Sequence, residues 1–316
     1  MENLLFSLNA TLPIFFLMLL GAFFRKARIM EGSFIDKVNQ FVFKVALPVM
    51  LFEELAKSDF QSVWDPRFVM FCFVVTLCSI GLVTLISLRI GDKSQRGEFI
   101  QAAYRSSASL LGIAFIKNMY GTASIGPLMI IGSVPLYNVL AVVVLSLTSP
   151  DRQGKGLNRN VVFGALKGIV TNPIILGIVA GVLWSLTGVQ QPAIMDKTLS
   201  SLEAVATPMG LMAMGASFDW KRASHGLKNA IGASIIKLVV LCVIFLPVAA
   251  LLGFRHEQMV AILVMLGSAT TVSCFVMARN MGHEGVLTSS VVAITTFGSA
   301  FTLTFWLYLL RSLGLV

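Results

Sequence analysis

Charged side chains are scarce in this sequence. Asp, Glu, Lys and Arg make up 12% of the 316 residues, about half of the roughly 25% that soluble domains carry. Hydrophobic residues account for 56%, and the mean hydropathy is +0.85. This composition excludes an ordinary water-soluble domain and predicts a protein embedded in a lipid bilayer.

The sequence also lacks the residue patterns of metal sites, disulfide frameworks and common enzymes. Its four cysteines all fall inside apolar stretches, where a thiol behaves as a small hydrophobic side chain. We find no H-E-x-x-H, Walker A or nucleophile-elbow motif, and no pair of aspartates inside an apolar run. We therefore predict no metal or other cofactor, and an intramembrane enzyme is kept only as an alternative.

Apolar residues occur in runs of about 20, the length that a helix needs to cross a bilayer. Lipid cannot satisfy the hydrogen bonds of the backbone, so each crossing segment must be helical. The sequence thus predicts an all-α polytopic membrane protein with ten transmembrane helices. Their expected positions are near residues 5–24, 38–56, 68–90, 98–120, 122–148, 161–187, 198–218, 228–252, 257–281 and 286–313.

The net charge of +9 is distributed unevenly along the chain. Basic clusters follow the first, third, fifth and seventh predicted helices and Arg279 follows the ninth, whereas the other connections are poor in Lys and Arg. Under the positive-inside rule, the odd-to-even connections are cytoplasmic and both termini lie outside. This distribution explains the basic residues as topology determinants, so we predict no nucleic-acid partner.

A weak internal repeat appears when the chain is shifted by 160 residues. The shift aligns Pro13 with Pro173, Gly21 with Gly181 and Asp36-Lys37 with Asp196-Lys197, as well as Pro48 with Pro208. It spans five predicted helices, an odd number, so the two copies cross the membrane in opposite senses. The sequence therefore predicts two inverted five-helix repeats, residues 1–150 and 160–316, an architecture typical of secondary transporters.

Small polar patches interrupt the fourth and ninth predicted helices at mid-depth. The first is "RSSASLLG" from Arg105, and the second is "GSATT" from Gly267. Small residues can pack unbroken membrane helices closely, which is one interpretation. The other is that both helices break here and cross, because the patches lie at corresponding places of the two repeats.

Two broken helices would place two helix N-termini at the middle of the membrane. Their free N–H groups and positive dipole ends favour an anion. No Asp or Glu occurs between Glu98 and Asp151, or between Glu257 and Glu284, which argues for an anionic rather than a cationic substrate. The candidate substrate-binding residues are Arg105, Ser106, Ser107, Ser109, Tyr137, Asn138, Ser268, Thr270 and Thr271.

Some polar residues have two interpretations. Arg105 either pairs with a substrate carboxylate or extends to the membrane surface or the freed carbonyl groups. Asn138 contacts either the ligand or a neighbouring helix. Lys44, Glu203 and Lys237 lie near predicted helix ends, so their charged groups are expected to reach the surface, and nothing places Glu54 near the site.

Three segments resemble the auxin efflux carrier family, in its short bacterial branch. They are "VNQFVFKVALPVMLF" from Val38, "GIAFIKNMYG" ending at Gly121 and "CFVMARNMG" ending at Gly282. The family often has a proline at each crossing, whereas this chain has Ser106-Ser107 and Ala269-Thr270 there.

The resemblance implies a scaffold of helices 1, 2, 6 and 7 and a mobile transport domain of helices 3–5 and 8–10. It further implies an elevator-type carrier of small organic acids in the bacterial cytoplasmic membrane, with a homodimer formed through the scaffold helices. A channel-like facilitator remains an alternative, because the same fold could conduct without alternating access.

Overall fold

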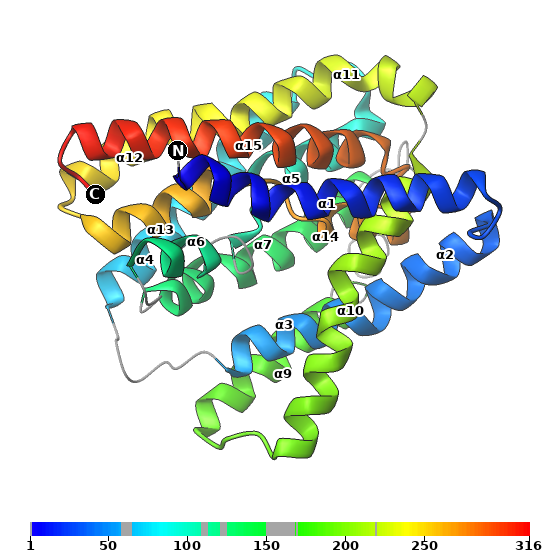
Figure 1. Cartoon of the computed structure of the whole chain (residues 1–316), viewed down its shortest axis with the longest axis horizontal. Coiled ribbons are helices and arrows are strands. Elements are labelled where there is room, and N and C mark those ends of the chain that lie inside the picture. Colours follow the sequence, from blue (N-terminus) through cyan, green and yellow to red (C-terminus); the bar gives the residue numbers. More distant parts are fainter. Residues whose placement is uncertain are drawn as a thin grey trace, which may run out of the picture.

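The computed structural model of the chain describes residues 2–57, 65–108, 113–120, 125–149, 168, 170–218 and 220–316, and these contain helices but no strand (Figure 1). The α-helices are α1 (Glu2–Lys26), α2 (Gly32–Phe41), α3 (Leu47–Ala56), α4 (Pro66–Ser87), α5 (Arg96–Tyr104), α6 (Ile113–Tyr120), α7 (Gly126–Thr148), α9 (Pro173–Thr187), α10 (Ala193–Ser217), α11 (Trp220–Ile235), α12 (Leu241–Leu251), α13 (His256–Gly267), α14 (Ser273–Asn280) and α15 (Val286–Ser312). Three short elements complete them: the π-helical turns η1 (Val42–Ala46) and η5 (Ile236–Val240) and the 3₁₀ turn η2 (Lys93–Gln95).

These helices follow the predicted spans wherever the chain is described. The segments Pro66–Ser87, Gly126–Thr148, Gly226–Leu251 and Val286–Ser312 are long and apolar enough to cross a membrane. The prediction of a polytopic helical membrane protein is therefore confirmed at this level. The count of ten helices stays a prediction, since the beginning of the sixth span lies outside the described residues.

Two helix starts show how local sequence sets the helix boundaries. Asp65 precedes α4 and accepts hydrogen bonds from the backbone N–H groups of Arg67 and Phe68, each at 3.1 Å. Asn172 precedes α9 and accepts from the N–H of Ile174 at 2.9 Å. Both helices then begin with proline, whose missing N–H would have no intrahelical partner at this position.

Two pairs of helices approach each other at glycines that the repeat aligns. A Cβ atom at Gly21 of α1 would lie 2.1 Å from the carbonyl oxygen of Met212 in α10, and one at Gly181 of α9 would lie 2.8 Å from that of Phe52 in α3. Only glycine permits such close helix contacts. The contact partners, Phe52 and Met212, are themselves separated by 160 residues.

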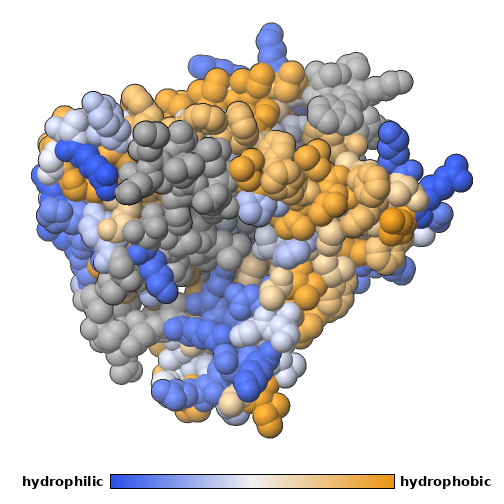
Figure 2. All heavy atoms as spheres, viewed as in Figure 1, coloured by the Kyte–Doolittle hydropathy of each residue, from blue (hydrophilic) through white to orange (hydrophobic). Residues whose placement is uncertain are grey.

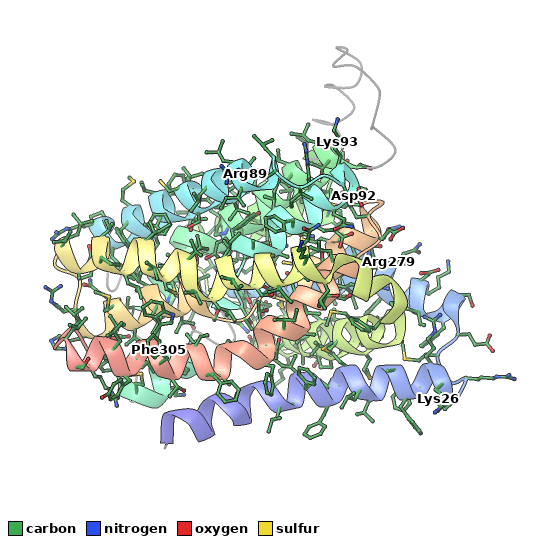
Figure 3. The ribbon with its side chains drawn as sticks, turned by 90° about the horizontal axis from the view of Figure 1, so that it is seen from above. Lys26, Arg89, Asp92, Lys93, Arg279 and Phe305 are labelled. Atoms are coloured by element: carbon green, nitrogen blue, oxygen red, sulfur yellow. The ribbon has the colours of Figure 1, made fainter. Side chains whose placement is uncertain are left out.

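The outer surface is apolar where a lipid-facing surface is expected. Figure 2 shows hydrophobic residues over a wide part of one face. Leu183 and Leu186 of α9 and Phe301 and Phe305 of α15 are exposed, and the sticks in Figure 3 show Phe305 at the molecular surface. In water this surface would cost free energy, whereas in a bilayer it contacts acyl chains.

Three basic residues lie toward one end of the molecule (Figure 3). Lys26, Lys93 and Arg279 lie in the same half in Figure 3, and all three belong to connections that the charge pattern assigns to the cytoplasm. Both chain termini lie toward the opposite end in Figure 1. These three basic residues and the two termini thus lie toward opposite ends of the molecule (Figures 1 and 3).

Candidate functional site: the crossing of two broken helices

Both polar patches interrupt their helices. Helix α5 ends at Tyr104, and Arg105 has an extended backbone with ψ of 137°. Helix α13 ends at Gly267, Ser268 is extended with ψ of 166°, and the chain becomes helical again at Ser273. The interpretation with unbroken helices is therefore wrong. The breaks form without proline, from Ser, Gly, Ala and Thr.

The two breaks are hydrogen-bonded to each other. The N–H of Ser107 donates to the carbonyl oxygen of Ala269 at 3.0 Å, and the hydroxyl of Thr270 donates to the carbonyl of Ala102 at 2.8 Å. The N–H of Thr270 donates to the hydroxyl of Thr295 in α15 at 3.0 Å. These bonds satisfy backbone groups that the breaks set free, which a buried break requires.

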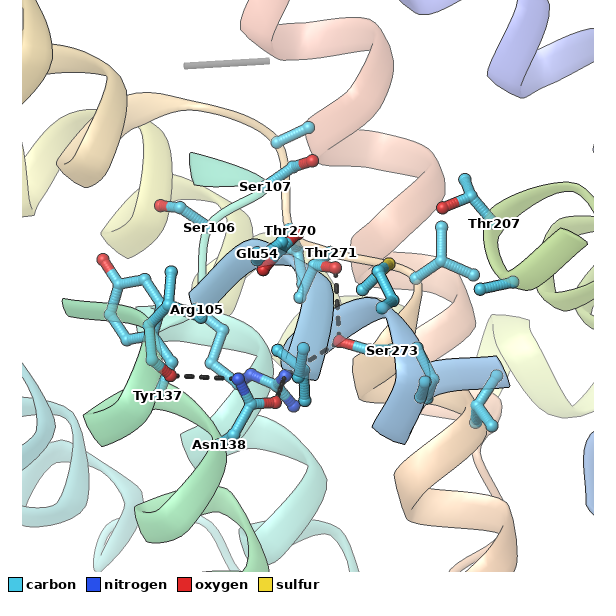
Figure 4. Close-up of a pocket in the computed structure, with 18 of the residues that line it drawn as sticks. Glu54, Arg105, Ser106, Ser107, Tyr137, Asn138, Thr207, Thr270, Thr271 and Ser273 are labelled. Carbon is cyan, nitrogen blue, oxygen red and sulfur yellow. Dashed lines mark hydrogen bonds between the residues drawn. The ribbon is translucent and has the colours of Figure 1, made fainter. Parts of the chain in front are cut away.

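A cavity of about 310 Å³ lies beside this crossing. The close-up in Figure 4 shows polar side chains directed into it from several helices. Apolar residues of α1, η1 and α3, including Ile14, Val42 and Leu51, line the cavity together with residues of the crossing. A volume of this size is at the lower end for small-molecule sites.

Besides Glu54, the charged residue that lines the cavity is Arg105. Its side chain is 1% exposed, and its Nη2 atom donates to Asn138 Oδ1 at 2.7 Å and to Ser273 Oγ at 2.8 Å (Figure 4). Its Nη1 atom lies 2.9 Å from the sulfur of Met277, and its Nε has no hydrogen-bond partner among the described residues. Arg105 therefore does not extend to the membrane surface.

No carboxylate of the described residues lies within ion-pair distance of Arg105. The ion pairs found there join Lys57 to Glu53 and Asp196, and Arg279 to Asp36. A buried charge without an opposite charge is costly, since ions lose several kcal/mol of hydration on burial. The guanidinium is held by neutral oxygens of Asn138 and Ser273, so its positive charge is not cancelled within the described chain.

The two serines of the fourth predicted helix differ in role. The hydroxyl of Ser106 donates to the carbonyl of Met265, and Tyr137 donates to the same carbonyl at 3.1 Å, so both hold the first half of the ninth helix. Ser107 lines the cavity, and its hydroxyl makes no hydrogen bond to the part of the chain that the structure describes. Ser107 is thus the freer hydroxyl of the pair.

Seven of the nine candidate residues line the cavity. They are Arg105, Ser106, Ser107, Tyr137, Asn138, Thr270 and Thr271. Ser268 is fully buried and is not among the lining residues, because the extended backbone at the break turns it into the protein. Ser109 lies outside the described residues. Asn138 accepts a hydrogen bond from Arg105, which directly follows α5, and it also lines the cavity. Contact with the ligand and contact with a neighbouring helix are therefore compatible for this residue.

Four polar residues that line the cavity were not among the candidates: Glu54, Thr207, Ser273 and Thr296 of α15. Ser273, at the start of α14, lies just beyond the polar patch, whereas Thr207 of α10 and Glu54 of α3 come from distant helices. Glu54 corrects the expectation that nothing places a carboxylate near the site. No local signal distinguishes it from Glu53, which is buried and binds Lys57 and Gln191.

The beginning of α14 lies at the cavity. Thr271, Val272 and Ser273 line it, and the first N–H groups of a helix have no partner within that helix. The hydroxyls of Thr271 and Ser273 lie 3.2 Å apart at this end. A helix N-terminus, these hydroxyls and the guanidinium of Arg105 together form a polar, positively biased surface suited to an anion.

Comparison with known proteins agrees with this architecture. A family model described as "Membrane transport protein" matches residues 6–307, and the chain belongs to this family, the auxin efflux carrier family. A protein of Rhizobium meliloti (strain 1021) named "Putative malonate transporter" is 24% identical over 318 residues, covering 95% of each chain. An "Uncharacterized transporter" of Methanothermobacter thermautotrophicus (strain Delta H) is 20% identical, covering 95% of this chain and 97% of its own.

This protein is thus a multi-pass member of a membrane transport family. The family and the names of these relatives indicate a transporter rather than an enzyme.

Proposed function

We propose that this protein is a secondary transporter of small organic anions, with the carboxylate bound in the cavity at the helix crossing. The observation that carries the proposal is Arg105, a guanidinium that is 1% exposed and has no carboxylate of the described chain within ion-pair distance. A bound carboxylate supplies the missing negative charge. Its planar shape also matches the two-pronged donor geometry of arginine.

A short dicarboxylate suits the remaining features of the cavity. The volume of about 310 Å³ accommodates a small molecule, and the hydroxyls of Ser107, Thr271 and Ser273 provide further donors. The name of the Rhizobium meliloti relative refers to malonate, a three-carbon diacid. We therefore take malonate as the first substrate to test.

The position of the cavity supports an elevator-type mechanism. Its lining combines Val42, Glu54 and Thr207, which belong to the proposed scaffold, with Arg105 and Ser273 of the proposed transport domain. A site between two bodies opens alternately when one slides against the other. We assign α1, α2, α3, α9 and α10 to the scaffold and α4–α7 and α11–α15 to the transport domain.

The aligned glycine contacts support the inverted repeat that this mechanism uses. Gly21 approaches Met212 and Gly181 approaches Phe52, and each residue of the first pair is 160 positions away from one of the second. Chance similarity of apolar sequences would not reproduce both the residues and their contacts. Residues 1–150 and 160–316 would then be related by an approximate two-fold axis in the membrane plane.

The proposal also includes the membrane, the orientation and the oligomeric state of the carrier. We propose the bacterial cytoplasmic membrane, with both termini outside, because Lys26, Lys93 and Arg279 lie toward the end of the molecule opposite to the termini (Figures 1 and 3). We also propose a homodimer formed through the scaffold helices, where α9 exposes Leu176, Leu183 and Leu186. The mass of the purified complex in detergent tests the dimer.

Binding and uptake experiments test the anion specificity. Purified protein is screened by thermal shift against mono- and dicarboxylates, indole acids and polyamines, and proteoliposomes are assayed for uptake of labelled malonate. We expect stabilisation by one or more acids and uptake that saturates with concentration. Stabilisation by polyamines without any acid would contradict the anion site, and uptake that never saturates would indicate a channel-like facilitator.

A further inference from the structure

Lys237 is a second buried cation at the crossing. It lies in the π-helical turn η5 between α11 and α12, and its side chain is 0% exposed. The sequence-based expectation that it reaches the membrane surface is therefore wrong. Lys44, in the π-helical turn η1, is exposed as expected. Because π-helical turns recur at functional sites, the different burial of these two lysines calls for an explanation.

The ammonium group of Lys237 is surrounded by oxygen atoms of both broken helices. Its Nζ lies 2.5 Å from the carbonyl oxygen of Leu266 and 3.4 Å from those of Met265 and Tyr104. It also donates to the hydroxyl of Ser106. The group thus meets the last turns of α5 and α13, where carbonyl oxygens have no partner within their own helix.

These two helix ends attract a cation. Each helix C-terminus carries a partial negative charge of about half an electron, and α5 and α13 both end at the crossing. An all-oxygen environment of carbonyls and a hydroxyl is also the kind that hard metal cations such as Na⁺ and K⁺ take. Lys237 places its charge among these oxygens, and no carboxylate of the described chain lies within ion-pair distance of it.

Lys237 and Arg105 lie on different sides of the first break. Arg105 lines the cavity, whereas Lys237 is absent from the residues that line it. Ser106 is shared between the two environments, since its hydroxyl bonds Lys237 and it also borders the cavity. Lys237 can therefore hold the two breaks together without contacting the substrate.

We propose that the ammonium of Lys237 is a resident cation that occupies an alkali-ion site formed by the carbonyls of Tyr104, Met265 and Leu266 and the hydroxyl of Ser106. Lys237 is thus a positioning residue: it neutralises the C-termini of α5 and α13, and the beginning of α14 remains available for the anion. As a consequence, the crossing stays assembled without a bound metal ion, and anion transport needs no sodium. This last point rests on the proposed function, whereas the cation site itself does not.

Melting temperatures in different salts test the cation site without any substrate. Purified wild-type protein, Lys237→Ala, Lys237→Met and the control Lys44→Ala are compared in sodium, lithium and choline chloride at equal ionic strength. Alanine opens the space in which a metal ion can replace the ammonium, whereas methionine fills it with an apolar chain. Lys44→Ala removes an exposed lysine from the equivalent type of turn.

We expect only Lys237→Ala to be stabilised saturably by Na⁺ or Li⁺ relative to choline. Wild type and Lys44→Ala should melt alike in all three salts, and Lys237→Met should melt lower without discriminating among them. Absence of a metal-specific rise in Lys237→Ala, or a saturable rise in the wild type, would overturn the proposal.

Uptake of malonate by wild-type proteoliposomes adds a second measurement that does not depend on a variant folding. Equal rates in sodium and choline support the resident cation, and a requirement for Na⁺ overturns it. If malonate and other acids are not transported in either salt, the proposed function fails, while the melting result still decides the cation site.

Discussion

Replacing Asn138 by aspartate should separate protein stability from substrate affinity. Asn138 Oδ1 accepts a hydrogen bond from Arg105 at 2.7 Å, so Asn138→Asp places a carboxylate against the buried guanidinium with almost no change in size. The new carboxylate supplies the negative charge beside Arg105 that we assign to the substrate. We expect the stability of the protein without ligand to change little and the affinity for malonate to fall.

The magnitudes follow from the contacts. Two opposite charges about 4 Å apart attract by about 4 kcal/mol at an effective dielectric constant of 20. Asn138 Nδ2 also donates to the carbonyl of Val134 at 2.9 Å, and losing this bond beside a carboxylate oxygen costs about 1–3 kcal/mol. Burying the new carboxylate also costs several kcal/mol of hydration, so the three contributions nearly cancel and Tm should stay within a few degrees of the wild-type value.

The affinity should change more strongly than the stability. If the introduced carboxylate cancels the attraction of about 4 kcal/mol between Arg105 and the substrate, the Kd rises nearly a thousandfold, since 1.4 kcal/mol corresponds to a factor of ten. Isothermal titration calorimetry with malonate and differential scanning fluorimetry of the protein without ligand measure the two quantities.

Asn39→Asp is the matched control, because Asn39 is equally buried, does not line the cavity and has no side-chain hydrogen bond. That control should lose stability and keep its affinity. Unchanged malonate affinity in Asn138→Asp, or a parallel fall of affinity and Tm, would refute the assignment of Arg105 to the substrate.

Three further predictions concern the site and the topology. Arg105→Lys keeps the charge but loses the two-pronged donor geometry, so we expect an affinity about tenfold weaker, or about 1.4 kcal/mol; titration of malonate measures this, and wild-type affinity would contradict a bidentate contact. Ser107→Leu should abolish uptake with near-normal expression, because an apolar side chain blocks the polar crossing. Ser106→Ala should mainly lower Tm through the lost hydrogen bond to Met265. Transport at the wild-type rate in Ser107→Leu would exclude Ser107 from the site. In a cysteine-free background, a cysteine at Ser224 should react with an impermeant reagent only from the cytoplasm and one at Gln190 only from outside, and the reverse labelling would invert the topology.

Local sequence determined the membrane character, the approximate helix positions and the places where two helices break. Apolar runs indicate a lipid environment because the side chains of a membrane-spanning helix that face lipid must be apolar. The patches at Ser106-Ser107 and Ala269-Thr270 interrupt such runs, and both breaks occur there. Most of the candidate cavity residues followed from these patches and from the polar residues at mid-depth of α7.

The tertiary structure decided which polar groups face one another. Glu54 and Glu53 are adjacent in sequence, yet one lines the cavity and the other binds Lys57. Lys237 looks like a lysine near a helix end, but packing against α5 and α13 buries its ammonium among carbonyl oxygens. The carbonyl oxygens around Lys237 come from residues between 28 and 133 positions away in the sequence, and the direction of a side chain around its helix axis depends on how the helices pack. The pattern of apolar residues does not specify these contacts, so they can be identified only in the folded structure.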